Sequence, residues 1–408
     1  MEAVRSTDRE TRCARALSLH EESGDRQAMA LDCYQLGTVY QDGGRLDLAI
    51  TMFRRALVLC EAIRDQQGVA AAYTRLGLLH EMKGDLGQAL FFLEEAQSRH
   101  DVLGDVRGLA ADVGYIGFVH FQQGEYDEAE RCYREALALN EQTSSSGKQA
   151  EDLANLGNLF STQGRDEEAE EAYHEALVLY EQVADHRGMG STYRSLGNMW
   201  LQRGDSEQAQ HLLELSLQLQ RQAGSALGEG LALESLGSIC ERDGRLEAAR
   251  DNYEQASLVL EATGHPKHMA QAHGRFGALL LRLDDANRAV GHLESAVALS
   301  RQQHDAAGTA RWCKRLADAV MKAEGDPKRV QELYDEAMVY FRDNSDLKGE
   351  AQVYVGMGNL EARQGKGTQA VAMWTAATER FRQLGVDDQV RNIEVAMKRL
   401  WTQGARVA

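Results

Sequence analysis

A pattern of glycines, repeated at a stride of 40 residues, is the feature that most constrains how this chain can fold. The first glycine of each unit lies at Gly37, Gly77, Gly117, Gly157, Gly197, Gly237, Gly277 and, after a one-residue insertion, Gly358, with Ala317 in the eighth unit. A second glycine follows seven residues later at Gly44, Gly84, Gly124, Gly164, Gly204, Gly244 and Gly365, and eight residues after Ala317 at Gly325. Nine similar units indicate a stacked array of small structural repeats.

Alanines and large apolar residues recur behind the second glycine, as at Ala129, Tyr133 and Ala136. Spacings of four and three residues place such side chains on one face of a helix. Each unit therefore predicts two helices, A and B, joined by a tight turn at the second glycine. We expect that glycine to end helix A in the left-handed conformation.

The first glycine of each unit falls inside helix A and follows an apolar residue, as in Leu156-Gly157. A glycine within a helix costs about 1 kcal/mol relative to alanine. Its recurrence predicts a place where helix B approaches closely. Only two prolines, Pro266 and Pro327, occur in 408 residues, which suits a chain that is almost entirely helical.

The pattern L-G-x-x-aromatic, followed by glycine, alanine, a large apolar residue and alanine, resembles the tetratricopeptide repeat. The aromatic residue after the first glycine is present at Tyr40, Phe160 and Trp200. The resemblance implies an all-α solenoid, a right-handed superhelix of helix-turn-helix repeats. The period of 40 residues is longer than the usual ~34, and the closing proline is replaced by glutamate in several units, at Glu61, Glu141 and Glu181. The long repeats are similar to those of Pins/LGN polarity adaptors and of bacterial tetratricopeptide sensor domains.

Three parts of the chain follow from this pattern. Residues 1–27 are predicted to form an N-terminal half-repeat helix, residues 28–386 nine repeats, and residues 387–408 a C-terminal capping helix and tail. Residues 9–22 match a helix B alone, because Ala16 aligns with Ala56. A helix B without its usual partner has three interpretations: the chain is cut from a longer protein, the helix caps the array, or it forms a surface for homo-oligomer formation.

The composition limits the classes of partner. A net charge of −18 argues against nucleic acid and against an anionic membrane surface. The six cysteines form no C-x-x-C pair, and no motif for phosphate binding, metal binding or nucleophilic catalysis is present. We therefore expect a protein that is not an enzyme, has no cofactor or metal and, without a visible signal peptide or membrane span, is cytoplasmic.

Function must then come from the groove that helix A lines on the concave face of such an array. Helix A positions that vary between repeats while facing this groove are candidates for ligand contact. These candidates are Phe118, Phe121, Asn155, Asn158, Arg194, Asn198, Arg242, Arg275, Arg282, Lys314, Arg315 and Asn359. The later part of this set is basic despite the acidic total, so it predicts contacts with an acidic peptide, although these cations are also candidates for pairing with neighbours such as Glu234 and Glu241.

The sequence therefore favours an adaptor or scaffold that binds a partner peptide or helix in its groove. One alternative is a regulatory sensor for a small ligand or a short peptide. Another is a scaffold that assembles with itself through its terminal repeats.

Overall fold

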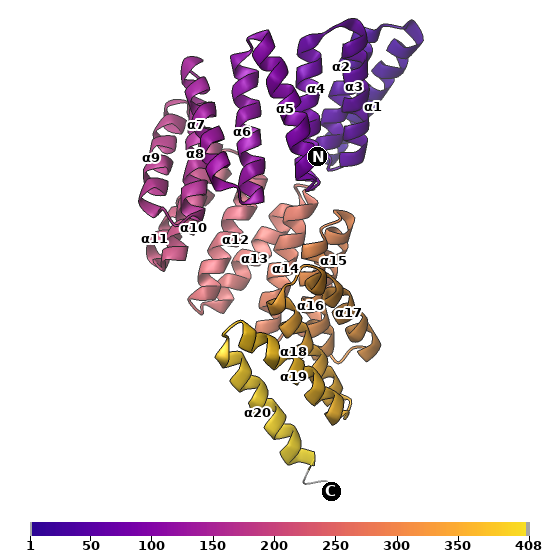
Figure 1. The fold of residues 1–408 in the computed structure, drawn as a ribbon, viewed down its shortest axis with the longest axis vertical. Coiled ribbons are helices and arrows are strands. Elements are labelled where there is room, and N and C mark those ends of the chain that lie inside the picture. The colour runs from indigo at the N-terminus through magenta and orange to yellow at the C-terminus, as the bar shows by residue number, and fades with distance from the viewer. Residues whose placement is uncertain (1, 405–408) are drawn as a thin grey trace. The chain divides into compact units, whose positions relative to one another are not determined.

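The computed structural model describes residues 2–404, and the side chains of residues 8–400. Those residues form twenty helices and no strand, which confirms the all-α solenoid (Figure 1). The chain divides into two compact units, Met1–Ile239 and Cys240–Ala408, which we describe separately.

The first unit contains α1 (Glu2–Ser23), α2 (Arg26–Asp42), α3 (Leu46–Ile63), α4 (Gln66–Met82), α5 (Leu86–Leu103), α6 (Val106–Gln123), α7 (Tyr126–Gln142), α8 (Ser146–Thr162), α9 (Asp166–Gln182), α10 (His186–Arg203), α11 (Ser206–Gln222) and most of α12 (Ala226–Arg242). The second contains the end of α12 and α13 (Leu246–Glu261), α14 (Pro266–Arg282), α15 (Ala286–Gln302), α16 (Ala306–Lys322), α17 (Pro327–Asp343), α18 (Leu347–Arg363), α19 (Gly367–Gln383) and α20 (Asp387–Gly404). The even-numbered helices from α2 to α18 stand at the positions expected for helix A, and the odd-numbered helices from α3 to α19 stand at those expected for helix B.

A residue with a positive φ angle lies in each turn between described helices, so the chain reverses about every 20 residues. The second glycine of each unit takes this conformation, as the sequence predicts, at Gly44, Gly84, Gly124, Gly164, Gly204, Gly244 and Gly365. Gly325 is the exception, because Glu324 holds the left-handed position there with a φ of 57°. Gly325 instead leads into Asp326, which caps the helix that Pro327 begins.

Aspartate follows the left-handed residue in many of these turns and starts the next helix. The Asp105 carboxylate accepts a hydrogen bond from the backbone N–H of Gly108 at 3.1 Å, and Asp305 accepts one from Gly308 at 2.8 Å. Such caps satisfy backbone donors that the first turn of a helix leaves open. The turn and the cap together fix the start of the helices that such an aspartate precedes.

The first glycine of each unit lies where helix B presses its largest side chain against helix A. A Cβ atom on Gly157 would lie 2.6 Å from Cε1 of Tyr173, and one on Gly277 would lie 2.7 Å from Cγ of Leu293. Tyr173 and Leu293 are almost completely buried. Close helix approach is therefore the physical reason for this glycine, which confirms the sequence prediction.

A third set of glycines lies where one repeat meets the next. Each lies in the first turn of helix A and contacts the last turn of the preceding helix B. A Cβ on Gly108 would lie 2.5 Å from the His100 ring, and one on Gly188 would lie 2.3 Å from Tyr180. The same contact recurs at Gly68, Gly228, Gly308 and Gly349.

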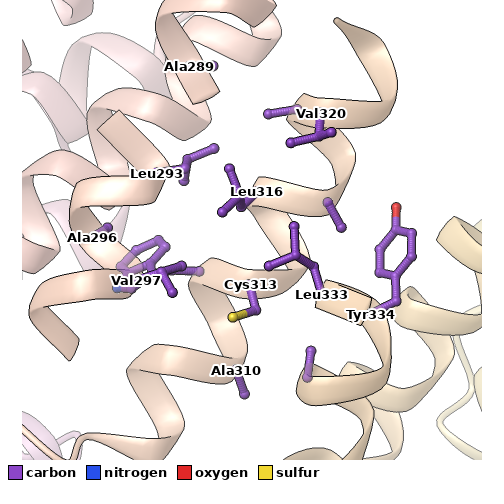
Figure 2. Close-up of a cluster of buried hydrophobic side chains, with 14 of the residues drawn as sticks. Ala289, Leu293, Ala296, Val297, Ala310, Cys313, Leu316, Val320, Leu333 and Tyr334 are labelled. Carbon is purple, nitrogen blue, oxygen red and sulfur yellow. The ribbon is translucent and has the colours of Figure 1, made fainter. Parts of the chain in front are cut away.

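Apolar side chains fill the space between the helices of each unit. In the second unit, α15, α16 and α17 contribute Leu293, Leu316 and Leu333 to one buried cluster (Figure 2). At the end of this unit, α20 packs Val390 and Ile393 in a cluster with Trp374 of α19. Lys398 of α20 stands 40 residues after Gly358, so a side chain occupies the position at which helix B approaches in the other repeats.

Two glycines of the pair α14 and α15 test this packing, because Gly277 lies against the other helix and Gly291 does not. Gly277→Ala should lower the free energy of unfolding of the second unit by about 1–3 kcal/mol, since the new methyl group overpacks the contact with Leu293. Gly291→Ala in the same repeat has no neighbour within 4 Å and should raise it by up to about 1 kcal/mol. Hydrogen exchange of α14 and α15 measures both effects, and equal changes of the same sign would contradict this account.

Candidate functional site

The A helices form the inner layer of each unit. Successive A helices contact one another across repeats: α4 contacts α6, α6 contacts α8, and α8 contacts α10 in the first unit, while α14 contacts α16 and α16 contacts α18 in the second. Helices that meet both their own B helix and the next A helix lie on the inner side of a curved array. We call the exposed face of these A helices the inner surface.

A hollow of about 280 Å³ opens on the inner surface of the first unit between α4, α6 and α8. Phe118 and Asn155, both predicted groove residues, line it together. Phe118 is 40% exposed, and Asn155 is half-buried. The remaining lining comes from Leu78, Glu81, Ala110, Ala111, Gly114, Tyr115, Asn140, Lys148, Glu151 and Asp152.

Charged groups surround this hollow unevenly. Lys148 pairs with Glu151, the two atoms Nζ and Oε2 lying 2.6 Å apart. Glu81 accepts a hydrogen bond from the Gln122 side chain. Asp152 is buried and accepts a hydrogen bond from Nδ2 of Asn140 at 2.7 Å. Carboxylates thus outnumber cations around the hollow.

Burial raises the pKa of Asp152 to about 7, and the Asn140 hydrogen bond opposes this shift only in part. Asp112 occupies the same position one repeat earlier and is also buried. Its pKa is likewise raised by burial, against the opposing hydrogen bonds from Thr74 and His100. Both carboxyl groups lie between consecutive repeats.

Other predicted groove residues of the first unit support the packing. Asn158 accepts a hydrogen bond from the Tyr173 hydroxyl at 2.9 Å. The Arg194 guanidinium is largely desolvated, which lowers its pKa, and the nearby Glu234 carboxylate opposes that shift. Asn198 is half-buried, and Phe121 packs against Tyr126 with 6.0 Å between ring centroids.

The basic residues of the second unit differ in how far they are already paired. Arg282 forms an ion pair with Glu241, and Lys314 lies 2.9 Å from Asp318. Arg315 is exposed and has no ion pair among residues 8–400. Arg242 and Arg275 are exposed and have polar partners, and Asn359 accepts a hydrogen bond from Nε1 of Trp374 at 3.2 Å.

Several long side chains near the C-terminal end of helix A reach back to the preceding helix A. Lys322 donates a hydrogen bond to the backbone carbonyl of Leu281 at 2.9 Å, and Arg363 donates one to the carbonyl of Met321. Arg282 makes the equivalent contact with Glu241. Part of the positive charge that the sequence places on the groove thus links neighbouring repeats.

In the described part of the chain, no cluster of three or more histidine, cysteine, aspartate or glutamate residues could hold a metal ion. None of the described helices is both long and apolar enough to cross a membrane.

A tetratricopeptide repeat model matches residues 26–100, 109–182, 151–222, 188–262 and 229–302. The chain belongs to the tetratricopeptide repeat family. This membership supports a role in protein interaction. No curated protein sequence matches the chain.

Solved tetratricopeptide repeat structures share the fold at low sequence identity. A signal transduction ATPase with numerous domains, which carries a tetratricopeptide repeat sensor and comes from Pyrococcus horikoshii, aligns over 86% of this chain and 55% of its own, with 14% identity and a TM-score of 0.61. The quorum sensor NprR from B. thuringiensis aligns over 84% and 99%, with 12% identity and a TM-score of 0.56. A Rap protein in complex with competence and sporulation factor aligns over 94% and 99%, with 14% identity and a TM-score of 0.53.

The raised pKa of Asp152 predicts a pH-dependent stability. The pKa of Asp152 in the folded protein lies above the ordinary value of about 4. The free energy of unfolding therefore falls as the pH rises from about 4 to 7, because ionisation of this carboxyl group disfavours the folded state. Asp152→Asn should remove that loss, so its gain over the natural protein should be larger at pH 8 than at pH 5, by on the order of 2 kcal/mol.

Hydrogen exchange of α6 to α9 at both pH values measures this difference. Asp127→Asn on the exposed face of α7 controls for the loss of one negative charge. A gain at Asp152 that does not depend on pH would contradict the prediction.

Proposed function

We propose that this protein is a non-catalytic adaptor that binds a segment of a protein partner on its inner surface. The hollow between α4, α6 and α8 is the observation that carries the proposal, because it exposes the Phe118 ring beside polar helix A side chains such as Asn155. An exposed apolar group bordered by hydrogen-bonding groups suits a peptide, whose backbone and side chains need both kinds of contact.

The second unit supplies the electrostatic part of this proposal. Arg275 and Arg315 stand at predicted groove positions of α14 and α16, and Arg315 has no ion pair among the described residues. Arginine forms paired hydrogen bonds with carboxylates, so an acidic segment is the partner that this surface favours. Arg282 and Lys314 are weaker candidates for ligand contact because Glu241 and Asp318 already compensate their charges.

A displayed library of short random peptides tests this partner chemistry directly. Peptides enriched on the natural protein should be rich in aspartate and glutamate, and Arg315→Glu should weaken their binding about tenfold or more. Lys267→Glu, which reverses an exposed charge in the first turn of α14, should leave binding unchanged. Enrichment without acidic residues, or equal losses in both variants, would refute the acidic partner.

Sensing of a small ligand or short peptide is a second candidate function. The solved neighbours described as a quorum sensor and as a protein with a sensor module motivate it. In that case a ligand should change hydrogen exchange in helices far from the hollow within the first unit. An adaptor should show protection at the hollow alone.

Self-association through α1 is a third candidate. Leu17 packs α1 against Cys33 and Leu36, but Ala16 remains half-buried, whereas the equivalent Ala56 is 1% exposed. The face that a helix A covers in the other repeats is therefore partly open in α1 among the described residues. A second copy of this chain would bury it.

The mass in solution tests this third candidate. Ala16→Arg should convert a dimer into a monomer because the new side chain stands in the proposed contact. Ala14→Arg places the same charge on an exposed neighbouring face and should leave the dimer intact. Light scattering at micromolar concentration measures both, and a monomeric natural protein would exclude self-association at that concentration.

A further inference from the structure

Two consecutive repeats place an aspartate at the same buried position but surround it differently. Asp112 and Asp152 are 40 residues apart, each five residues before the first glycine of its helix A. Asp112 is completely buried, and Asp152 is 5% exposed. One carboxylate oxygen of each is held by the last turn of the preceding helix B, through His100 for Asp112 and through Asn140 for Asp152, at 2.6 and 2.7 Å.

The two positions differ in the partner of the second carboxylate oxygen. Thr74 of α4 donates a hydrogen bond to Oδ1 of Asp112 at 2.7 Å, which completes the partners of that carboxylate. The residue equivalent to Thr74 in the next repeat is Gly114 of α6. Oδ1 of Asp152 has no hydrogen-bond partner among residues 8–400.

Gly114 also creates the space beside that oxygen. A Cβ atom on Gly114 would lie 3.6 Å from Oδ1 of Asp152 and 3.9 Å from Cβ of Ala136, so a small side chain would fit without a clash. Both Gly114 and Asp152 line the hollow between α4, α6 and α8. The missing side chain thus opens the hollow down to a buried carboxyl group.

The rest of the hollow suits a positively charged group. Phe118 and Tyr115 line the hollow, and the faces of aromatic rings attract cations. Glu81 adds a second carboxylate, whereas the single cation, Lys148, already pairs with Glu151. A volume of about 280 Å³ is small for a whole drug-sized ligand but suits the end of one long side chain.

We propose that the hollow beneath Gly114 is a subsite for a guanidinium or ammonium group, carried by an arginine or lysine side chain of the bound segment and held by Oδ1 of Asp152. This inference rests on the proposed function and adds to it. The first unit selects a basic side chain, in contrast to the acidic segment proposed for the second unit. An ion pair inside a partly desolvated hollow fixes the register of a segment as well as its affinity.

The titration of Asp152 is consistent with this role. An ionised carboxylate that burial disfavours gains most from an incoming cation, so binding should weaken as the pH falls through about 7. Lys148 and Glu151 of α8 interact electrostatically with the Asp152 carboxyl group. Tyr115 interacts with Lys148, and Tyr133 and Tyr180 interact with Asp152 from the neighbouring B helices. Glu81 faces the same hollow from α4.

The test uses the full chain and three small probes: the capped tripeptide acetyl-Gly-Arg-Gly-amide, the same peptide with the uncharged isostere citrulline, and agmatine as a free cation. NMR titration of alanine methyl groups reports from the hollow through Ala110 and Ala111. The arginine peptide should shift these signals in a saturable manner and bind about tenfold more weakly at pH 6 than at pH 8. The citrulline peptide should bind at least tenfold more weakly than the arginine peptide.

Three variants assign the binding to this subsite. Asp152→Asn keeps the acceptor for Asn140 but removes the charge, and Gly114→Thr supplies the hydroxyl that Thr74 supplies to Asp112. Both should lose at least tenfold in affinity for the arginine peptide. Asp112→Asn, the matched control one repeat earlier, should bind it as the natural protein does.

Other results would overturn the inference. No saturable shift, equal binding of the citrulline peptide, or full binding by Gly114→Thr would each reject a cation subsite at Asp152. If agmatine binds as tightly as the arginine peptide, the subsite takes a free cation, and the proposal that it takes a side chain of a bound segment is wrong. The peptide library is read separately: if it yields no binders while the arginine probe requires Asp152, the adaptor function fails and the cation subsite remains.

Discussion

The contact between a glycine of helix A and the largest side chain of helix B is the constraint on which this structure depends. Tyr173 and Leu293 can be buried only because no Cβ stands at Gly157 and Gly277. The contact brings the two helices of a repeat together and turns the remaining faces of helix A away from the core. Those faces are then available for neighbouring repeats and for ligands.

The sequence predicted the helical pairs and their close contact because these depend on residues near one another in the chain. Periodic alanines define the face of each helix, and the second glycine marks most turns. The exception at Gly325 arose because Glu324 takes the left-handed conformation one residue earlier. The glycines that join repeats, such as Gly108, were visible in the sequence but could not be interpreted without knowing that His100 lies opposite.

The candidate site was less accessible to sequence reasoning because partners from other repeats decide what each side chain does. Phe118 and Asn155 do line a common hollow, yet Asn158 accepts a hydrogen bond from the Tyr173 hydroxyl. Arg282 lies at a groove position but pairs with Glu241 of the preceding helix A. Position along a helix thus predicts which way a residue points, whereas its availability depends on what the next repeat places beside it.

The exchange of Thr74 for Gly114 has a wider consequence for arrays of this kind. At two neighbouring positions of this array, the residue three before the first glycine of helix A decides whether the space beside the next repeat's aspartate is filled, as by Thr74, or open, as at Gly114. Single substitutions at this position can therefore open or close the space between two A helices without altering the spacing of the repeats. Such a protein can change its selectivity one subsite at a time, while the spacing between its repeats stays the same.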